Sequence, residues 1–354
     1  MTESGPRYRA PDLLDFAAAL LARTGLAEPR SRVVAEVLLE GDLLGHTTHG
    51  LALLPRYLDE LAHDRMEREG EPVVVNDRGG ALTWDGHRLP GPWLVTRAIE
   101  EARRRLATYG VVSVAIRRSH HIGCLQAYLS RATDEGLVLW LTCSDPSVGG
   151  VTPHGGVASR ITPNPIAAGF PTNGDPVLVD VSLSTTSNAM ARRTFDEGGR
   201  LPGKWVVARS GEATDDPSVL FGDAPGAVLP LGGLDLGHKG YGLALFVEAL
   251  TSGLGGHGRA EAPKEWGASV FLQLIDPEAF GGRSAFVRET SHVAEMCRTT
   301  PVAAGRPPVR TPGQAALGRR AAQQRHGVAL YPSIMPALAP WAERYGVAPP
   351  TALA

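Results

Sequence analysis

Both ends of the chain carry apolar residues at helical spacing. Residues 12–24 place leucines, alanines and a phenylalanine three or four positions apart, and Gly25 follows as a typical residue after a helix. The same pattern predicts further helices at about 29–44, 55–66, 284–298, 314–325 and 333–345. The sequence therefore predicts helical segments at the two ends of the chain.

The middle of the chain carries short runs of valine, isoleucine and leucine, which are typical of strands. Such runs lie at 73–75, 81–84, 111–116, 137–143, 177–181 and 270–275, with helices expected at 93–108 and 125–135. The simplest architecture is an α/β domain inserted into a helical domain that the two ends build together. We expect the helical domain to comprise residues 1–75 plus 283–354 and the inserted domain residues 76–282.

A glycine-rich stretch runs from Leu229 to Gly242 and has five glycines around Lys239. Glycines permit positive φ angles, and a helix that begins after them directs unpaired N–H groups at one place. The stretch predicts a turn that binds an anion beside Lys239, followed by a buried helix that extends to Leu250. The alternative is a glycine-rich turn without a ligand.

Composition and charge narrow the range of functions. A net charge of −2 gives no electrostatic reason to expect nucleic acid or an anionic membrane as a partner. The three cysteines form no CxxC pair, and their odd number favours a reducing, cytoplasmic location over a disulfide framework. The first ten residues lack the apolar segment of a signal peptide, and no apolar run is long enough to cross a membrane.

Two pairs of histidines are the candidates for catalysis. His46 and His49 flank two threonines in a polar break, and His120 and His121 follow a predicted strand, where α/β proteins place reactive groups. Histidine acts as a general acid or base near neutral pH, and a neighbouring hydroxyl such as that of Thr48 can fix its tautomer. Each histidine could equally be a hydrogen-bonded structural residue. No carboxylate or cysteine completes a recognisable metal-binding spacing, so no metal is expected.

Two common catalytic and cofactor motifs are absent from the sequence. There is no GxSxG for a serine nucleophile and no GxGxxG for a Rossmann dinucleotide site. Any dinucleotide must therefore be held by a different fold. The residues alone predict an anion-binding α/β enzyme with a histidine acid.

Several segments, in order from about residue 12 to 345, resemble the malate/L-lactate dehydrogenase family that lacks a Rossmann domain. This family includes ureidoglycolate dehydrogenase, sulfolactate dehydrogenase and the piperideine/pyrroline-2-carboxylate reductases. The family pattern GHDSHG resembles residues 45–50, Ser-x-His-x-Gly matches 119–123, and GTNPIA resembles 162–167. The pattern D-x-x-x-S fits 180–184, LPLGG with KGYGLA is reproduced at 229–244, and PGE appears as Pro-Gly-Gln at 312–314.

The resemblance implies an α/β (α+β) fold. A non-Rossmann NAD(P)-binding domain with a largely antiparallel sheet would be inserted in a discontinuous helical domain that carries substrate and dimer contacts. The implied reaction is hydride transfer between NAD(P)H and a small 2-oxo acid, giving the 2-hydroxy acid, with a histidine as acid/base in a homodimer. NAD and NADP are both compatible with the sequence. The alternatives are an NAD(P)H-dependent reductase of cyclic imines and a cofactor-binding homologue without catalysis.

The resemblance also implies site residues by position. His49 and His121 are both candidates for the proton donor or acceptor, with Thr48 in place of an assisting serine. The expected cofactor contacts are His121, Ile122, Gly123, Cys124, Leu125, Ser144, Asp180, Val181, Ser182, His238, Lys239 and Gly240.

Three departures from the family pattern bear on the substrate. Thr48 adds a methyl group to the pocket, and Pro163 replaces a threonine, which removes a hydroxyl and a backbone donor. Leu53 stands where imine-reducing relatives have an arginine that binds the substrate carboxylate. Arg56, one turn further, is the expected substitute, with Ser184 as a second substrate contact. The missing arginine disfavours the imine-reductase alternative.

Overall fold

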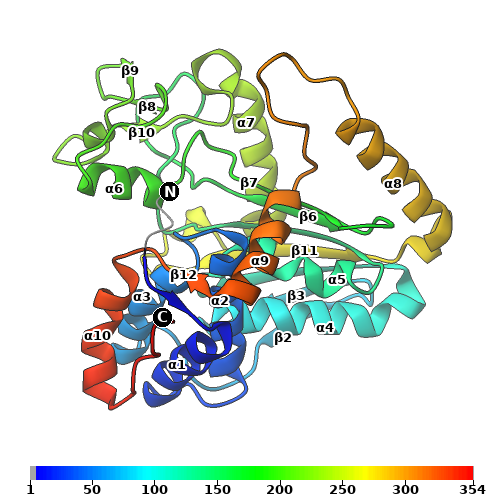
Figure 1. Ribbon diagram of the computed structural model, residues 1–354, viewed down its shortest axis with the longest axis horizontal. Coiled ribbons are helices and arrows are strands. Elements are labelled where there is room, and N and C mark those ends of the chain that lie inside the picture. The colour runs from blue at the N-terminus through cyan, green and yellow to red at the C-terminus, as the bar shows by residue number, and fades with distance from the viewer. Residues whose placement is uncertain (1–4, 354) are drawn as a thin grey trace.

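The computed structural model describes residues 5–353 and has a seven-stranded sheet at its centre (Figure 1). Its strand order is β2–β3–β4–β11–β5–β6–β7, and β3 and β4 form the parallel pair. The strands are β2 Val73–Asp77, β3 Ala81–Asp85, β4 Val111–Ser119, β5 Val138–Ser144, β6 Ile166–Phe170, β7 Val177–Val181 and β11 Ala268–Ile275. All other neighbours are antiparallel, which confirms the expected fold class.

Alternation along the strands gives the sheet two apolar faces. Helix α4 (Gly91–Tyr109) makes the crossover that a parallel pair requires, and its apolar residues pack with Leu139 and Leu141 in the main core. The intervening Trp140 points the other way and stacks on Phe246 of α7 (Gly233–Glu248), with ring centroids 6.2 Å apart. Helices therefore cover both faces of the sheet.

A helical lobe with its own core lies below the sheet in Figure 1. It contains α1 Ala10–Arg23, α2 Arg30–Leu44, η1 Leu51–Leu53, α3 Leu54–Ala62 and α10 Ile334–Tyr345. Most apolar residues of α2 face this core, but Val37 belongs to the core of the sheet. Helix α9 (Gln314–His326) returns to α2, where Gln323 Nε2 donates to the carbonyl oxygens of Asp42 and Leu43 at 2.9 and 3.0 Å.

A third core forms a small-sheet lobe, made of residues 183–247 and the 151–161 loop. This lobe contains the three-stranded sheet β10–β8–β9 and helix α6 (Asn188–Asp196). Its strands are β8 Val206–Val207, β9 Ala213–Thr214 and β10 Ala227–Val228. In Figure 1 it lies across the sheet from the helical lobe, so the strand-rich middle of the chain contains more than one core.

The glycine-rich stretch differs from its prediction. Helix α7 already begins at Gly233, so Lys239 lies within the helix and is exposed, and only residues 229–232 form the turn. Gly240 has to be a glycine, because a Cβ at this position would collide with the backbone of Leu231, against which the helix packs. The apolar side chains of Leu243 and Phe246 are 45% and 50% exposed. The prediction of a buried helix was therefore wrong for this chain by itself.

Two other elements differ from the sequence prediction. The helix expected at 125–135 is split into the short 3-10 segment η2 (Leu125–Tyr128) and α5 (Ser130–Thr133). Helix α8 (Arg283–Arg298) lies beside the β6–β7 turn, where Thr290 Oγ1 donates to Pro171 O at 2.8 Å. Thus α8 does not pack in the core of the helical lobe, whereas α10 does. The division into 1–75 plus 283–354 and 76–282 stays a prediction.

Two predictions from the composition concern the cysteines and the membrane-spanning segments. Cys124, Cys143 and Cys297 are all free thiols. Within residues 5–353, no helix combines the length and the apolar character that crossing a membrane would need.

Candidate active site

A cavity of about 740 Å³ lies where the sheet, the helical lobe and the small-sheet lobe meet. Its walls include the 46–49 loop, His121 with residues 123–125, the ends of β5 and β7 and the first turn of α6. The cavity brings together the predicted site residues Thr48, His49, Arg56, His121, Gly123, Cys124, Leu125, Ser144, Asp180 and Ser182.

The other predicted residues lie outside the cavity lining. Ile122 is buried, Val181 is exposed, and Ser184 is buried with its hydroxyl donating to Thr186 O at 2.7 Å. His238, Lys239 and Gly240 lie on α7, where the His238 ring packs edge-on against His154. Their assignment as cofactor or substrate contacts stays a prediction.

The loop that carries His49 is held from two sides. Below it, Asp42 Oδ2 accepts a hydrogen bond of 2.6 Å from the Leu51 N–H, and Gly50 leaves room for this carboxyl group because any Cβ would collide with it. Burial raises the pKa of Asp42 to about 7. From the small-sheet lobe, Arg193 of α6 donates two hydrogen bonds of 3.0 Å to Thr47 Oγ1 and Thr47 O.

His49 is held in the cavity as a neutral imidazole. Its Nδ1 lies 2.9 Å from Thr48 Oγ1, the hydroxyl that the sequence named as its partner. Burial, and to a lesser extent positive charge on His46 and Arg193, lowers the pKa of His49 to about 4. At neutral pH its ring can therefore accept a proton.

His121 has one defined neutral tautomer. The Gly123 N–H donates to His121 Nδ1 at 3.2 Å, and a backbone N–H can only donate. Nδ1 is therefore the unprotonated nitrogen, and the neutral ring carries its proton on Nε2. Tyr57 OH lies 3.0 Å from Nδ1 and 2.8 Å from His121 O, which fixes the ring and its backbone. Burial lowers the pKa of His121 well below its ordinary value, and positive charge on His49, His120 or Arg56 would act in the same direction.

The four histidines divide into three environments. The rings of His49 and His121 are stacked with centroids 6.0 Å apart and an interplanar angle of 28°. His120 is fully buried outside the cavity lining, with Nε2 3.3 Å from Glu60 Oε2, and is a structural residue. This hydrogen bond is the main cause that lowers the pKa of Glu60 to about 2. His46 lies on another part of the cavity wall.

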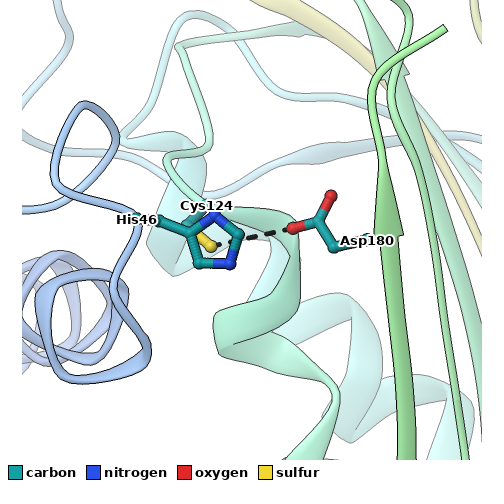
Figure 2. A group of neighbouring side chains, drawn as sticks. All are labelled: His46, Cys124 and Asp180. Atoms are coloured by element: carbon teal, nitrogen blue, oxygen red, sulfur yellow. Dashed lines mark hydrogen bonds between the residues drawn. The ribbon is translucent and has the colours of Figure 1, made fainter. Parts of the chain in front are cut away.

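His46 forms a polar cluster with Cys124 and Asp180 (Figure 2). Asp180 Oδ2 accepts from the Gln126 N–H at 2.9 Å and from Cys124 Sγ at 3.8 Å. Gln126 Nε2 donates to Leu178 O, so its Oε1 is the acceptor of the 2.7 Å hydrogen bond from His46 Nε2. Burial raises the pKa of Asp180, which positive charge on His46 opposes.

This cluster also has donor atoms at a spacing that could hold a metal ion, since they lie within 4.8 Å of one another. This spacing could not be predicted from the sequence, because the cysteine and the carboxylate come from segments far from His46 in the chain. Gln126 links His46 to Asp180, and Cys124 donates to the same Asp180 carboxylate, so each of the three side chains already has a hydrogen-bond partner without a metal.

The cavity suits a nucleotide cofactor without a Rossmann motif. Ser187 caps α6 by accepting from the Met190 N–H at 3.1 Å, and Asn188 and Ala189 in the first turn line the cavity. The N-terminus of a helix presents free N–H groups and a partial positive charge to a phosphate. Ser187 was not among the predicted site residues, although a serine before a short helical pattern is a signal for a helix cap.

The comparisons with known proteins agree with this geometry. The family model for malate/L-lactate dehydrogenase matches residues 8–339. An L-lactate dehydrogenase of Cupriavidus necator is 32% identical over 326 residues, covering 90% of this chain and 92% of that protein. Among solved structures, the Δ1-piperideine-2-carboxylate reductase of Pseudomonas syringae pvar. tomato has a TM-score of 0.82 at 26% identity, covering 95% and 99%. The malate dehydrogenase of Entamoeba histolytica shares the fold with a TM-score of 0.92 at 22% identity, covering 98% and 100%. The protein thus belongs to the malate/L-lactate dehydrogenase family and is a nicotinamide-dependent oxidoreductase of hydroxy acids.

Proposed function

We propose that the protein interconverts a small 2-hydroxy acid and its 2-oxo acid, with His49 and His121 as the polar groups at the reacting oxygen. The observation that carries the proposal is the stacked pair of neutral imidazoles in a cavity that also holds Arg56. A 2-oxo acid needs a proton-transferring group at its carbonyl and a cation at its carboxylate, and this cavity offers both.

The two histidines have different roles in this proposal. With Nδ1 fixed as an acceptor, neutral His121 presents its Nε2–H as a hydrogen-bond donor to the substrate oxygen. His49 can donate its Nδ1–H to Thr48 and keep Nε2 free, which makes it the base when the hydroxy acid is oxidised. In the reverse direction His49 must first be protonated to act as the acid. The bound nicotinamide supplies or accepts the hydride, and the chain positions the substrate and moves the proton.

The first experiment is coenzyme binding followed by turnover. NADH and NADPH are titrated by fluorescence, and a panel of 2-oxo acids, including pyruvate, oxaloacetate and glyoxylate, is then added. We expect consumption of one reduced coenzyme with at least one acid, which also decides between NAD and NADP. Tight coenzyme binding with activity only on cyclic imines would replace the proposal by the imine-reductase alternative. Binding without any turnover would favour the non-catalytic homologue.

We also propose that the protein acts as a homodimer in the cytoplasm. The support for a dimer is a group of exposed apolar residues on α7 and just beyond η4 (Ala249–Gly253): Leu234, Leu236, Leu243, Leu245, Phe246 and Leu254. Each of these side chains is between 45% and 56% exposed, and an exposed apolar patch of this kind is typical of a self-association surface. The three free thiols support a reducing compartment.

A further inference from the structure

Trp266 lies in the cavity although it belongs to none of the sequence motifs. It precedes β11 and is half-buried, and its indole ring contacts the groups that the proposed reaction uses. The Arg56 guanidinium carbon lies 3.4 Å from the ring centroid. The His121 imidazole is stacked on the same indole, with centroids 4.6 Å apart and an interplanar angle of 23°. One side chain thus contacts both the cation and a histidine of the site.

Arg56 has its hydrogen-bonding capacity available. Within residues 5–353, the cavity lining contains no other lysine or arginine. The carboxylates that act on its charge through space are already engaged: Glu60 by Arg65 and His120, and Asp145 by Ser147. A guanidinium that lies flat on an aromatic ring keeps its N–H groups free in its own plane, where they can bind a carboxylate with two parallel hydrogen bonds.

Leu53 cannot bind the substrate carboxylate. It lines the cavity one turn before Arg56 and offers only an apolar surface. A long arginine side chain from the next turn would lose considerable freedom on binding a substrate, unless another group already holds it. The indole of Trp266 provides that restraint before the substrate arrives.

We infer that Trp266 is a positioning residue that holds Arg56 as the receptor for the substrate carboxylate and orients His121 at the neighbouring carbonyl. This inference rests on the proposed function and specifies its substrate class. One rigid ring contacts both groups, and on the proposed function the acids that the site accepts have their carboxylate bonded to the reacting carbonyl carbon. Acids with the carboxylate further along the chain, and amides without the negative charge, fit it poorly.

The test compares an acid with its amide in matched variants. The best 2-oxo acid of the panel and its C1 carboxamide are assayed with wild type, Arg56→Gln, Arg56→Lys, Trp266→Phe and Trp266→Leu. Arg344 lies over Trp341 on α10, outside the cavity, so Arg344→Gln and Trp341→Phe are controls for a surface arginine–tryptophan pair. Coenzyme affinity and melting temperature are measured for each protein.

Arg56→Gln should lower the acid-to-amide ratio of kcat/KM roughly 10- to 150-fold, the range for a hydrogen bond to a charged group. Trp266→Leu should raise KM for the acid about tenfold and lower the same ratio, while Trp266→Phe retains most of both. Arg56→Lys keeps the charge but not the flat stacking, and should resemble Trp266→Leu. The controls should leave the ratio unchanged. If the amide is not turned over, the inhibition constant of oxamate, which carries a carboxylate, should rise by a similar factor in Arg56→Gln.

Equal losses on acid and amide in Arg56→Gln would show that Arg56 does not bind the carboxylate and would overturn the inference. If Trp266→Leu left both the acid-to-amide ratio of kcat/KM and the KM for the acid unchanged, the indole would not position Arg56. These results are distinct from failure of the proposed function, in which wild type itself would turn over no 2-oxo acid.

Discussion

The cavity histidines differ in how each Nδ1 atom is used, and this difference gives a prediction for pH. His49 has a pKa of about 4, so it stays neutral, and therefore basic, above that pH. For oxidation of the hydroxy acid, kcat/KM should show no fall near pH 6.5, the ordinary pKa of histidine. It should fall only near pH 4, where the substrate carboxyl group also titrates. An acid limb centred near 6.5, measured on protein that circular dichroism shows to be folded, would contradict the assignment.

Removal of either imidazole should affect turnover more than coenzyme binding. His49→Ala removes the proton acceptor and should lower kcat about 10²- to 10⁴-fold, with a coenzyme Kd within about threefold of wild type. His121→Gln keeps an N–H donor and should retain more activity than His121→Ala. Near-normal turnover in both alanine variants, measured under saturating coenzyme, would show that neither ring transfers the proton.

Asp42 should make stability depend on pH. Its folded pKa of about 7 lies above the ordinary value of 3.8, so the folded state holds its proton more tightly. This contribution is fully present below the lower value, decreases as pH rises between the two values, and is constant above about 7. Asp42→Asn cannot ionise and should lose less stability than wild type between pH 5 and 8. The full shift corresponds to an upper value on the order of 4 kcal/mol. Melting temperatures that change in parallel for both proteins would contradict this account.

At the residue scale, the sequence could identify His49, His121 and Thr48 because motifs carry them. It could not identify Trp266 or Arg193, which reach the site only through the fold. Trp266 precedes a strand without any local pattern, and Arg193 contacts Thr47 from another lobe. Because both residues reach the site from distant parts of the chain, no periodicity or motif spacing in a single sequence could indicate their positions.

At the scale of elements, α4 and the His120–His121 segment are in direct contact at Gly91. A Cβ on Gly91 would collide with the carbonyl oxygens of both histidines. Gly91→Ala should therefore destabilise the protein by about 1–3 kcal/mol and lower kcat/KM, because the backbone held by Tyr57 must move. Gly318→Ala in α9 is the matched control, since nothing lies within 4 Å of its Cβ position, and it should stabilise by about 0.5–1 kcal/mol. Unfolding experiments and steady-state kinetics measure both; equal behaviour of the two variants would exclude the steric explanation.

Most of the long helices and apolar strands could be predicted from sequence patterns alone. The helices α1, α2, α9 and α10 and the apolar strands β4, β5 and β11 could be predicted from the spacing of their apolar residues. Strand β6 was missed because its sequence, Ile-Ala-Ala-Gly-Phe, has small residues with weak strand propensity. The beginning of α7 was misplaced because glycine normally disfavours a helix interior, and only packing against Leu231 explains its use there.

At the scale of the whole molecule, the exposed apolar residues of α7 give a test of self-association. Phe246→Glu or Leu243→Glu would place a charge in the proposed interface and should convert the dimer into a monomer in light scattering. Val302→Glu, at a half-exposed apolar residue outside α7, is a control. If wild type is already monomeric at micromolar concentration, the dimer proposal is wrong.

The sharing of α2 between two cores has a mechanical consequence. Since Val37 packs in one core and the rest of α2 in another, the sheet and the helical lobe form a single rigid frame. The cavity lies between this frame and the small-sheet lobe. At the cavity Arg193 joins this lobe to the frame, binding Thr47 and lying 3.7 Å over the Tyr331 ring.

Arg193 would then act as a latch that controls how fast coenzyme exchanges. Arg193→Gln should accelerate both the association and the release of coenzyme severalfold. Its Kd should change little, because Kd is the ratio of these two rate constants and both rise together. Stopped-flow fluorescence separates these rates. A change confined to the release rate would instead make Arg193 an ordinary binding contact. Coenzyme exchange would then be limited by contacts inside the cavity and not by the link between the small-sheet lobe and the frame.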